Sequence, residues 1–446
     1  MIARTKIMPM KFTFLSAVVA LSLFVNNPSS GQTAQVHSRM QPYTFDTGLL
    51  SSRAGEAATR VAFSGVVKVP GSPWLRLSFS GVSLGRASYL TVTSLGDGAQ
   101  QRLDARALAQ WKNSSAYFNG DAVRVDLHLA SGDSNVFARM SEVMVGDDGS
   151  GESQCGTTDD RIVSTDGRAG RLLNIGCTAW LIADGRFVSA GHCVESASLL
   201  NTVEFNVPPS LPNGTIQHPA PEDQYVANSA TRVYSNNGIG NDWGVFETFP
   251  NSQTGLTALQ AQGAFFNVAQ DLSPATIRIT GYGVDDGTAN QTEQTNTGPN
   301  AGSSGTTMRY RVDTEGGNSG SPVIDEATGN SVGIHTNAGC STGGGSNSGT
   351  SNFNAALWAE IGQSSGGDIV LEARSQRQGT KRQVVLRWAP ADGGNINVLR
   401  DGAVVQTSAD DGKAKDNLGT RTGTFTYQVC ETDSGDCSNE LEVVVQ

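Results

Sequence analysis

The sequence predicts a mostly β protein, and three observations support this fold class. Short runs rich in Val, Thr, Ser and Gly, in which apolar and polar residues alternate, recur along the chain. Gly is abundant, at 53 residues, which suits many tight turns. Long segments rich in Ala, Glu, Lys and Leu, typical of helices, do not stand out. Because 446 residues are too many for one ordinary domain, we expect several β units.

The N-terminus, residues 1–34, is predicted to be a signal peptide. Arg4, Lys6 and Lys11 form a basic start, and the apolar run "FTFLSAVVALSLFV" (12–25) follows. The alternative is a membrane anchor, but this run is short for a transmembrane span and no other run approaches that length. We therefore expect a secreted protein that loses its signal peptide and has no membrane partner.

Residues 35–150 are predicted to form a small β-sandwich. The runs "ATRVAFSGVVKV", "WLRLSFSGVSL", "SYLTVTSL" and "AVRVDLHL" alternate in polarity and are separated by Gly, Asp and Ser turns. The polar, Gly-rich stretch "GDDGSGESQ" (146–154) is a candidate linker and processing site. This unit is either a pro-region, which we favour because of the linker, or an accessory binding domain.

Residues 151–363 form the largest predicted unit. Within it, the stretch "TANQTEQTNTGPNAGSSGTT" (288–307) is predicted to be a polar, low-complexity loop. The run "SSGGD" (364–368) marks the next domain boundary.

The tail, residues 369–446, consists of short strand-like runs with a Trp early and a Tyr late. Trp388 and Tyr427 give it a resemblance to a fibronectin type III domain, which implies a β-sandwich. It either binds a surface or a polysaccharide, or acts as a spacer.

Charge and motif content exclude several function classes. The net charge is −11 with no basic stripe, so nucleic acid is not an expected partner. The chain has no CxxC pair, no HExxH motif and no clustered His/Cys ligand set, so we expect no metal and no cofactor. Six Cys residues, an even number, are compatible with disulfides in an exported protein.

The stretch "EGGNSGSPV" (315–323) places Ser319 among glycines. A serine hydroxyl needs a base that takes its proton and donors that hold the oxyanion formed on attack. A tight Gly-rich turn can aim the backbone N–H groups of Gly317 and Ser319 at one point. The alternative is a plain Gly/Ser surface loop.

Two further stretches supply the other members of such a site. In "VSAGHCV" (188–194), His192 follows a strand-like run and stands beside Cys193. In "GNDWGVFE" (240–247), Asp242 opens a short apolar strand and could orient His192. Each alone would suit a structural histidine or a turn aspartate.

Together these stretches resemble the chymotrypsin-like serine proteases over residues 170–340. The segments "SAGHC", "DWGVF" and "GNSGSP" match the family's catalytic motifs in the order His, Asp, Ser. The resemblance implies a double β-barrel and a serine endopeptidase. It assigns Ser319 as nucleophile, His192 as general base and acid, Asp242 as the residue that orients the histidine, and Gly317 and Ser319 as oxyanion donors.

The activation signal of the digestive members of this family does not carry over. The run "DDRIV" (159–163) looks like their cleavage site, but the residue before Ser319 is Asn318, which cannot form their ion pair with a new N-terminus. We interpret "RIV" as a coincidence and expect cleavage somewhere in 147–170.

Specificity has two interpretations. The pocket floor is expected from Asp313, Thr314 and the run "GIHTNAG" (333–339), which contains His335 and Thr336. A trypsin-like pocket with Asp313 at its base would select Arg or Lys. The pattern also resembles the bacterial glutamyl endopeptidases, which implies that Thr314 and His335 bind a substrate carboxylate. We favour cleavage after Glu or Asp.

The resemblance also bears on the disulfides. The 16-residue spacing of Cys177 and Cys193 matches the family's bridge beside the histidine. Cys430 and Cys437 lie close together in the tail. The digestive enzymes pair the Cys340 position with a cysteine just before the serine, where this chain has Glu315, so we expect Cys155–Cys340 instead.

The main hypothesis is therefore a secreted, monomeric serine endopeptidase that acts on proteins or peptides. Its rival is a non-catalytic secreted binding protein built on a dead protease fold, but all three candidate catalytic residues are present.

Overall fold

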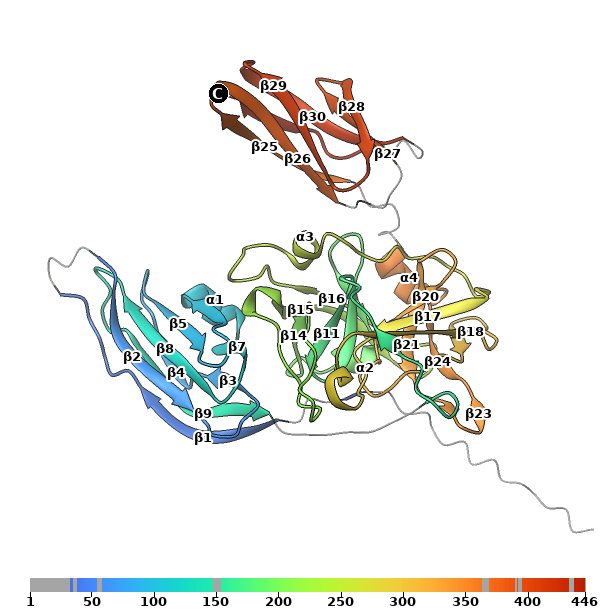
Figure 1. The fold of residues 1–446 in the computed structure, drawn as a ribbon, viewed down its shortest axis with the longest axis horizontal. Coiled ribbons are helices and arrows are strands. Elements are labelled where there is room, and N and C mark those ends of the chain that lie inside the picture. Colours follow the sequence, from blue (N-terminus) through green and yellow to red (C-terminus); the bar gives the residue numbers. More distant parts are fainter. Residues whose placement is uncertain are drawn as a thin grey trace, which may run out of the picture.

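The computed structural model describes residues 33–34, 38–53, 58–146, 154–362, 369–389, 391, 395–432 and 437–445 (Figure 1). Nearly all of the predicted signal peptide, most of the 146–154 linker and the 364–368 boundary lie outside these residues. Three β-rich units follow one another along the chain, and the catalytic candidates lie in the central one. The mostly β fold class is confirmed.

The N-terminal unit is a sandwich of two antiparallel sheets. The first sheet has the order β1 (Ser38–Asp46), β9 (Phe137–Gly146), β3 (Trp74–Ser78) and β7 (Ser114–Asn119), with β4 (Gly81–Ser83) beside β9. The second has the order β2 (Arg60–Lys68), β8 (Ala122–Leu129), β5 (Tyr89–Ser94) and β6 (Gln100–Leu103). Helix α1 (Ala105–Gln110) begins at Asp104, whose carboxylate accepts from two N–H groups of its first turn. Alternate residues of β8 point into the apolar core between the sheets.

The central unit begins with a closed six-stranded barrel. Its order is β11 (Ala169–Asn174), β12 (Cys177–Leu181), β13 (Phe187–Ser189), β16 (Asp242–Thr248), β15 (Gln224–Asn236) and β14 (Leu200–Glu204). Three short helices lie on the connections: α2 (Gly191–Val194), η1 (Pro221–Asp223) and α3 (Ala258–Gln262). Closure leaves no free sheet edge, and apolar side chains such as Trp180 and Phe187 fill the interior.

The second half of the central unit is a seven-stranded sheet that does not close in the described residues. Its order is β10 (Ile162–Val163), β18 (Gln294–Pro299), β17 (Thr276–Gly281), β20 (Pro322–Asp325), β21 (Ser331–Asn337), β24 (Asn347–Ser351) and β19 (Thr307–Tyr310). The pair β22 (Cys340–Ser341) and β23 (Gly344–Gly345) and the helices η2 (Gly287–Ala289) and α4 (Ala355–Ile361) accompany it. One closed barrel and one half-barrel are consistent with the expected chymotrypsin-like double-barrel fold. The stretch 288–307, predicted to be a loop, contains β18.

The C-terminal unit is a second sandwich. One sheet contains β25 (Val370–Gln378), β26 (Lys381–Ala389) and β29 (Lys413–Gly419). The other has the order β28 (Ala403–Ala409), β27 (Asn395–Arg400), β30 (Gly423–Glu431) and β31 (Leu441–Val445). Trp388 and Tyr427 are both buried in the core between the sheets. The likeness to fibronectin type III stays a prediction.

The N-terminal sandwich packs directly on the central barrel. Tyr117 stacks on His218 at a centroid distance of 4.6 Å, and its phenol hydrogen-bonds Asn174. Its backbone exchanges two hydrogen bonds with the side chain of Gln224, at 3.0 Å each. Trp74 joins Tyr117, Leu173 and Ile216 in an apolar cluster that spans both units. The two units therefore share a buried interface.

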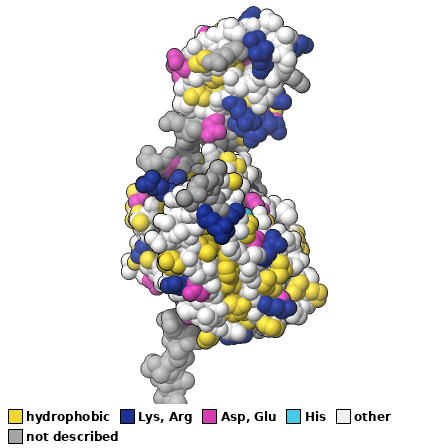
Figure 2. Space-filling model, turned by 90° about the vertical axis from the view of Figure 1, so that its left-hand side faces the viewer, with side chains coloured by type: hydrophobic (Ala, Val, Ile, Leu, Met, Phe, Trp, Pro, Cys, Tyr) yellow, Lys and Arg dark blue, Asp and Glu magenta, His cyan; other side chains and the backbone are white. Residues whose placement is uncertain are grey.

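The surface shows no broad single-sign field on the face drawn in Figure 2, where Lys and Arg side chains lie in several separate groups. In the described residues no helix is long and apolar enough to cross a membrane.

Candidate active site

The first two catalytic candidates meet at the end of the closed barrel. His192 lies in α2, directly after β13, and Asp242 is the first residue of β16. Because β13 and β16 pair with Ser189 opposite Gly244, the start of α2 lies beside the start of β16. This strand pairing brings His192 and Asp242 together, although they are 50 positions apart in the sequence.

Asp242 holds His192 at two points. Its Oδ1 accepts the backbone N–H of His192 at 3.0 Å, and its Oδ2 lies 2.6 Å from Nδ1 of the ring. Since a carboxylate only accepts, Nδ1 carries the proton and the other ring nitrogen, Nε2, points away from Asp242. This orientation is the one a general base requires.

The serine loop needs glycine at two positions. Gly317 has φ = +104°, and a side chain there would collide with the carbonyl of Tyr282. Gly320 has φ = +89°, and a side chain there would collide with the carbonyl of Thr178. The glycines of "EGGNSGSPV" thus let the loop turn sharply against the barrel.

Strand β12 fixes the direction of the backbone groups in this loop. The hydroxyl of Thr178 donates to the carbonyl of Gly317 at 3.0 Å, and its N–H donates to the carbonyl of Ser319 at 2.8 Å. The carbonyls are therefore drawn toward β12. In the described part of the chain, the N–H groups of Gly317 and Ser319 donate to no protein acceptor. They are the candidate oxyanion donors.

Ser319 lies close to the histidine helix, but its hydroxyl is turned elsewhere. Its carbonyl oxygen lies 3.8 Å from the sulfur of Cys193, the neighbour of His192. Its hydroxyl donates to the carbonyl of Thr336 at 3.4 Å, and Nε2 of His192 has no partner among the described residues. A rotation about the Cα–Cβ bond of Ser319 is required to form the serine–histidine hydrogen bond.

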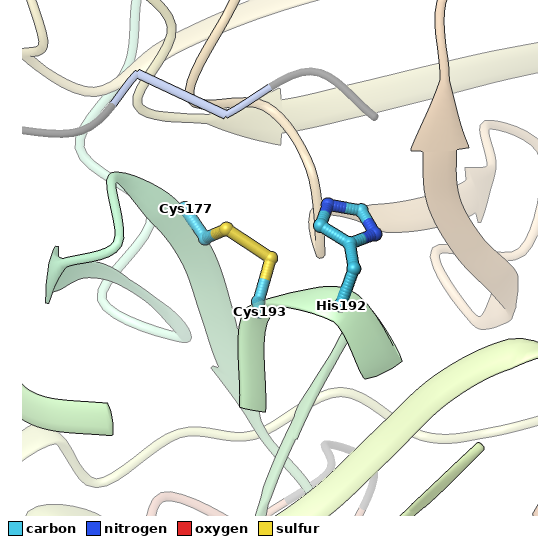
Figure 3. Close-up of side chains that lie close together, drawn as sticks. All are labelled: Cys177, His192 and Cys193. Carbon is cyan, nitrogen blue, oxygen red and sulfur yellow. A yellow bond between two sulfur atoms is a disulfide. The ribbon is translucent and has the colours of Figure 1, made fainter. Parts of the chain in front are cut away.

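The disulfide Cys177–Cys193 lies next to His192 (Figure 3). These three side chains are close enough together to suggest a metal site. Both sulfurs are bonded to each other, so neither offers the thiolate that a metal would need. The bridge instead ties α2 to β12. The other two predicted disulfides, Cys155–Cys340 and Cys430–Cys437, are also present.

The predicted pocket histidine is fully buried and held by a tyrosine. Nδ1 of His335 lies 2.7 Å from the phenol oxygen of Tyr310, which stands two strands away. Between them on β24 is Gly349, where a side chain would approach the phenol oxygen to 3.1 Å. Burial, together with the charge of nearby His192, lowers the pKa of His335 to about 3. The ring is therefore neutral at ordinary pH.

Thr314 and Thr336 are also fully buried. Asn347, on β24, donates to the hydroxyl of Thr314 at 2.8 Å and to the carbonyl of Val312 at 2.8 Å. The hydroxyl of Thr336 donates to Asn337 at 2.7 Å. Thr314 is thus fixed by a neighbouring strand, whereas the hydroxyl of Thr336 donates to the side chain of Asn337 and its backbone carbonyl accepts from the hydroxyl of Ser319.

The carboxylate of Asp313 is engaged by the start of the catalytic unit. One oxygen accepts the N–H of Cys155 at 2.8 Å and the other accepts the N–H of Asp160 at 2.9 Å. This use of both oxygens anchors the segment that the Cys155–Cys340 disulfide also ties down. Asp313 therefore acts here as an anchor for that segment.

The "RIV" segment is placed outside the catalytic loop. Ile162 is 66% exposed and pairs with β18 as part of β10. The side chain of Asn318 accepts the N–H of Glu315 at 2.8 Å, so it closes its own turn. Tyr310, Asn347 and Gly349 were missed by sequence reasoning, because none stands beside a recognisable motif.

Comparisons with known proteins found one family model and several solved structures that are similar to parts of the chain. A family model described as a trypsin-like peptidase domain matches residues 177–334. Among solved structures, a Glu endopeptidase in complex with MPD is similar at 22% identity, covering 47% of this chain and 99% of that chain, with a TM-score of 0.36. A thermostable serine protease AL20 from an extremophilic microorganism has 15% identity, coverages of 46% and 99%, and a TM-score of 0.35. The Vibrio cholerae VesB protease has 9% identity, coverages of 65% and 100%, and a TM-score of 0.32.

No curated protein matches the chain. The segment matched by the family model contains His192, Asp242 and Ser319. The chain therefore carries a trypsin-like peptidase domain, and the reaction class this supports is peptide-bond hydrolysis on protein or peptide substrates.

Proposed function

We propose that the protein is a serine endopeptidase that uses His192, Asp242 and Ser319 and cleaves after Glu, and more weakly after Asp. The observation that supports the catalytic assignment most directly is the two-point contact of Asp242 with His192 beside the serine loop. In the first step Ser319 Oγ attacks the substrate carbonyl carbon while His192 Nε2 takes the hydroxyl proton. The N–H groups of Gly317 and Ser319 hold the oxyanion.

The tetrahedral intermediate then collapses. His192 gives its proton to the leaving amine, and the C–N bond breaks to leave an ester on Ser319. Water, deprotonated by His192, hydrolyses this ester and frees the enzyme. Asp242 stabilises the imidazolium that forms in both halves of the reaction.

The preference for Glu is supported by the donors of the pocket. When Tyr310 donates to Nδ1 of His335, the proton of the neutral ring sits on Nε2, which becomes a donor. Thr314 accepts from Asn347, so its own O–H acts as a donor as well. A carboxylate, which only accepts, matches such a donor set.

A preference for Arg or Lys has less support. Such a side chain brings donors and a positive charge, and it needs an acceptor at the pocket base. Asp313 was the candidate for that role, but its two carboxylate oxygens already accept backbone N–H groups. Selecting a basic residue would require Asp313 to abandon both of these contacts.

The test is a cleavage-site profile. The purified protein and its Ser319→Ala variant are incubated with a denatured peptide mixture, and the products are sequenced. The Ser321→Ala variant is a matched control, since its hydroxyl has no partner among the described residues. Cuts after Glu that vanish only in Ser319→Ala support the proposal. Cuts after Arg or Lys overturn the specificity, and no serine-dependent cut in folded protein overturns the function.

We also propose that the enzyme acts after export. The predicted signal peptide and the three disulfides support this, because disulfides persist in oxidising compartments. Edman sequencing of the protein secreted by its producing cell would test it.

A further inference from the structure

We propose that the enzyme cleaves its own chain at the peptide bond that precedes Thr33, and that Thr33 and Ala34 then remain docked on the leaving-group side of the site. This inference rests on the proposed function. It assigns to the site a substrate that belongs to the same chain, and it places the end of the removed segment at residue 32 instead of the predicted residue 34.

Thr33 and Ala34 lie across the active-site loops. The N–H of Ala34 donates to the carbonyl of Gly176 at 2.8 Å. A Cβ built on Gly316 would lie 3.1 Å from the carbonyl oxygen of Thr33. Gly176 precedes the disulfide cysteine Cys177, and Gly316 precedes the oxyanion residue Gly317. The segment therefore bridges the two loops that flank the catalytic groups, and Figure 3 shows it in pale blue above the disulfide.

The direction of the segment indicates which bond is presented. Ala34 is hydrogen-bonded to Gly176, and the carbonyl oxygen of Thr33 lies beside Gly316, the residue before Gly317. We infer from this direction that the bond on the N-terminal side of Thr33 is the one presented to the oxyanion donors. The residues that follow Thr33 occupy the place of a leaving group.

The sequence supplies a suitable residue before this bond. Gln32 precedes Thr33, and its carboxamide oxygen is a hydrogen-bond acceptor like the carboxylate of Glu. The donor set proposed for the pocket, Nε2–H of neutral His335 and the O–H of Thr314, suits an uncharged acceptor as well as a charged one.

The N-terminal sandwich makes the reaction intramolecular. Strand β1 begins at Ser38, four positions after Ala34, a span of at most about 14 Å. The same sandwich contacts Asn174 through Tyr117, two positions before Gly176. Because the sandwich is docked on β11, Thr33 and Ala34 lie within reach of the active site of the same chain.

The chemistry is that of the proposed function. Ser319 Oγ forms a bond to the carbonyl carbon of Gln32, and the C–N bond to Thr33 breaks. His192 passes the serine proton to the Thr33 nitrogen, which becomes a new amino terminus. One water molecule then hydrolyses the ester and leaves a carboxylate on Gln32, so one water is consumed for each cleavage.

The test uses the full 446-residue chain made by cell-free translation in an oxidising glutathione buffer without membranes, so that no signal peptidase is present. We expect wild type to lose residues 1–32 and to begin at Thr33 by intact mass and Edman sequencing, whereas Ser319→Ala keeps its first residues. The rate is expected to be unchanged on tenfold dilution. Identical N-termini in both proteins, or a rate that falls tenfold on dilution, would overturn the proposal.

A second pair of variants keeps the result independent of the fold of Ser319→Ala. Gln32→Lys is expected to slow the self-cleavage at least tenfold, and Gln35→Lys, the same change three positions later, is expected to leave it within about threefold. A Glu-containing peptide is assayed in parallel. If wild type cuts the peptide but not itself, only this inference fails; if it cuts neither, the proposed function fails too.

Discussion

The phenol oxygen of Tyr310 lies 2.7 Å from Nδ1 of His335, and both side chains are fully buried. The contact reaches across β24, where Gly349 leaves room for it. A histidine held in this way keeps one tautomer and no charge. Its role in the proposed pocket is therefore that of a fixed hydrogen-bond donor, which makes Tyr310 a positioning residue for specificity.

Replacing Tyr310 by Phe tests this relationship. The change leaves Nδ1 of His335 without its hydroxyl partner, and an unsatisfied buried polar atom costs about 1–3 kcal/mol. We expect kcat/KM for a Glu peptide to fall about tenfold or more, with a shift in the ratio of Glu to Gln cleavage. Tyr234→Phe, on an exposed side chain, is the control. If the ratio of Glu to Gln cleavage is unchanged in Tyr310→Phe, Tyr310 has no role in specificity.

Asp242→Asn tests the orientation of the catalytic histidine. An amide in place of the carboxylate can present its NH2 group to His192, which favours the wrong tautomer of the ring. We expect kcat to fall by about 10⁴ while the variant stays folded. Steady-state kinetics on a Glu peptide, with circular dichroism as the folding check, measure this. A loss smaller than tenfold contradicts the assigned role.

Glu293 predicts a pH dependence of stability. Burial raises the pKa of this carboxyl to about 7 from an ordinary value of 4.5. Between these two values the unfolded chain releases the proton and the folded chain keeps it, so stability falls as pH rises through this window, by about 3 kcal/mol in all. Glu293→Gln is expected to remove this loss and to be the more stable protein at pH 8.

Urea unfolding at pH 5 and pH 8 measures the Glu293 effect. The side chain accepts the N–H of Asp166 and the hydroxyl of Tyr282, contacts that the amide oxygen and amide group of Gln can replace in part. Glu247→Gln, on an exposed residue of β16, controls for loss of a surface charge. Equal pH dependence in wild type and Glu293→Gln would rule out this carboxyl as the cause.

The interface between the N-terminal sandwich and the barrel predicts what cleavage of the linker will do. Tyr117 contributes a ring stack on His218 and hydrogen bonds to Asn174 and Gln224. We expect a chain cut at an engineered site within 147–153 to elute as one particle in size-exclusion chromatography. Such an outcome favours an accessory domain over a pro-region that leaves.

The matched variants of this experiment are Tyr117→Ala and Tyr89→Ala. Truncating a buried aromatic at an interface typically costs about 3–5 kcal/mol, so the cut Tyr117→Ala protein is expected to separate into two parts. Tyr89 stacks on His128 within the sandwich and serves as the control. If the cut wild-type protein also separates into the sandwich and the remainder of the chain, the interface is weak.

Local motifs made much of the site predictable, and strand register hid the rest. Each candidate catalytic residue lies in a short motif that can be recognised from the sequence alone: Ser319 among glycines, His192 after a strand-like run, and Asp242 at the start of an apolar strand. Tyr310 becomes a partner of His335 only through the register of β24, which no short stretch encodes. Pairing also explains β18, whose polar residues gave no apolar alternation and yet form a strand between β10 and β17.

Asp313 shows the same limit for a charged residue. Its position before the serine loop suggested a pocket base, but its carboxylate accepts N–H groups from a segment more than 150 positions earlier. Residues so far apart in the sequence meet only in the folded protein, so neighbouring residues in the sequence could not predict where the Asp313 side chain points.

The Cys155–Cys340 bridge joins two positions separated by 185 residues, and it fastens the entry of the catalytic unit to the segment that follows the pocket strand β21. In a chain whose thiols are kept reduced, this covalent tie is absent, and the entry segment is held only by contacts such as the two hydrogen bonds to Asp313. The bridge therefore lowers the conformational entropy of the unfolded chain by closing a loop of 185 residues, which is a contribution to stability that the hydrogen bonds cannot supply.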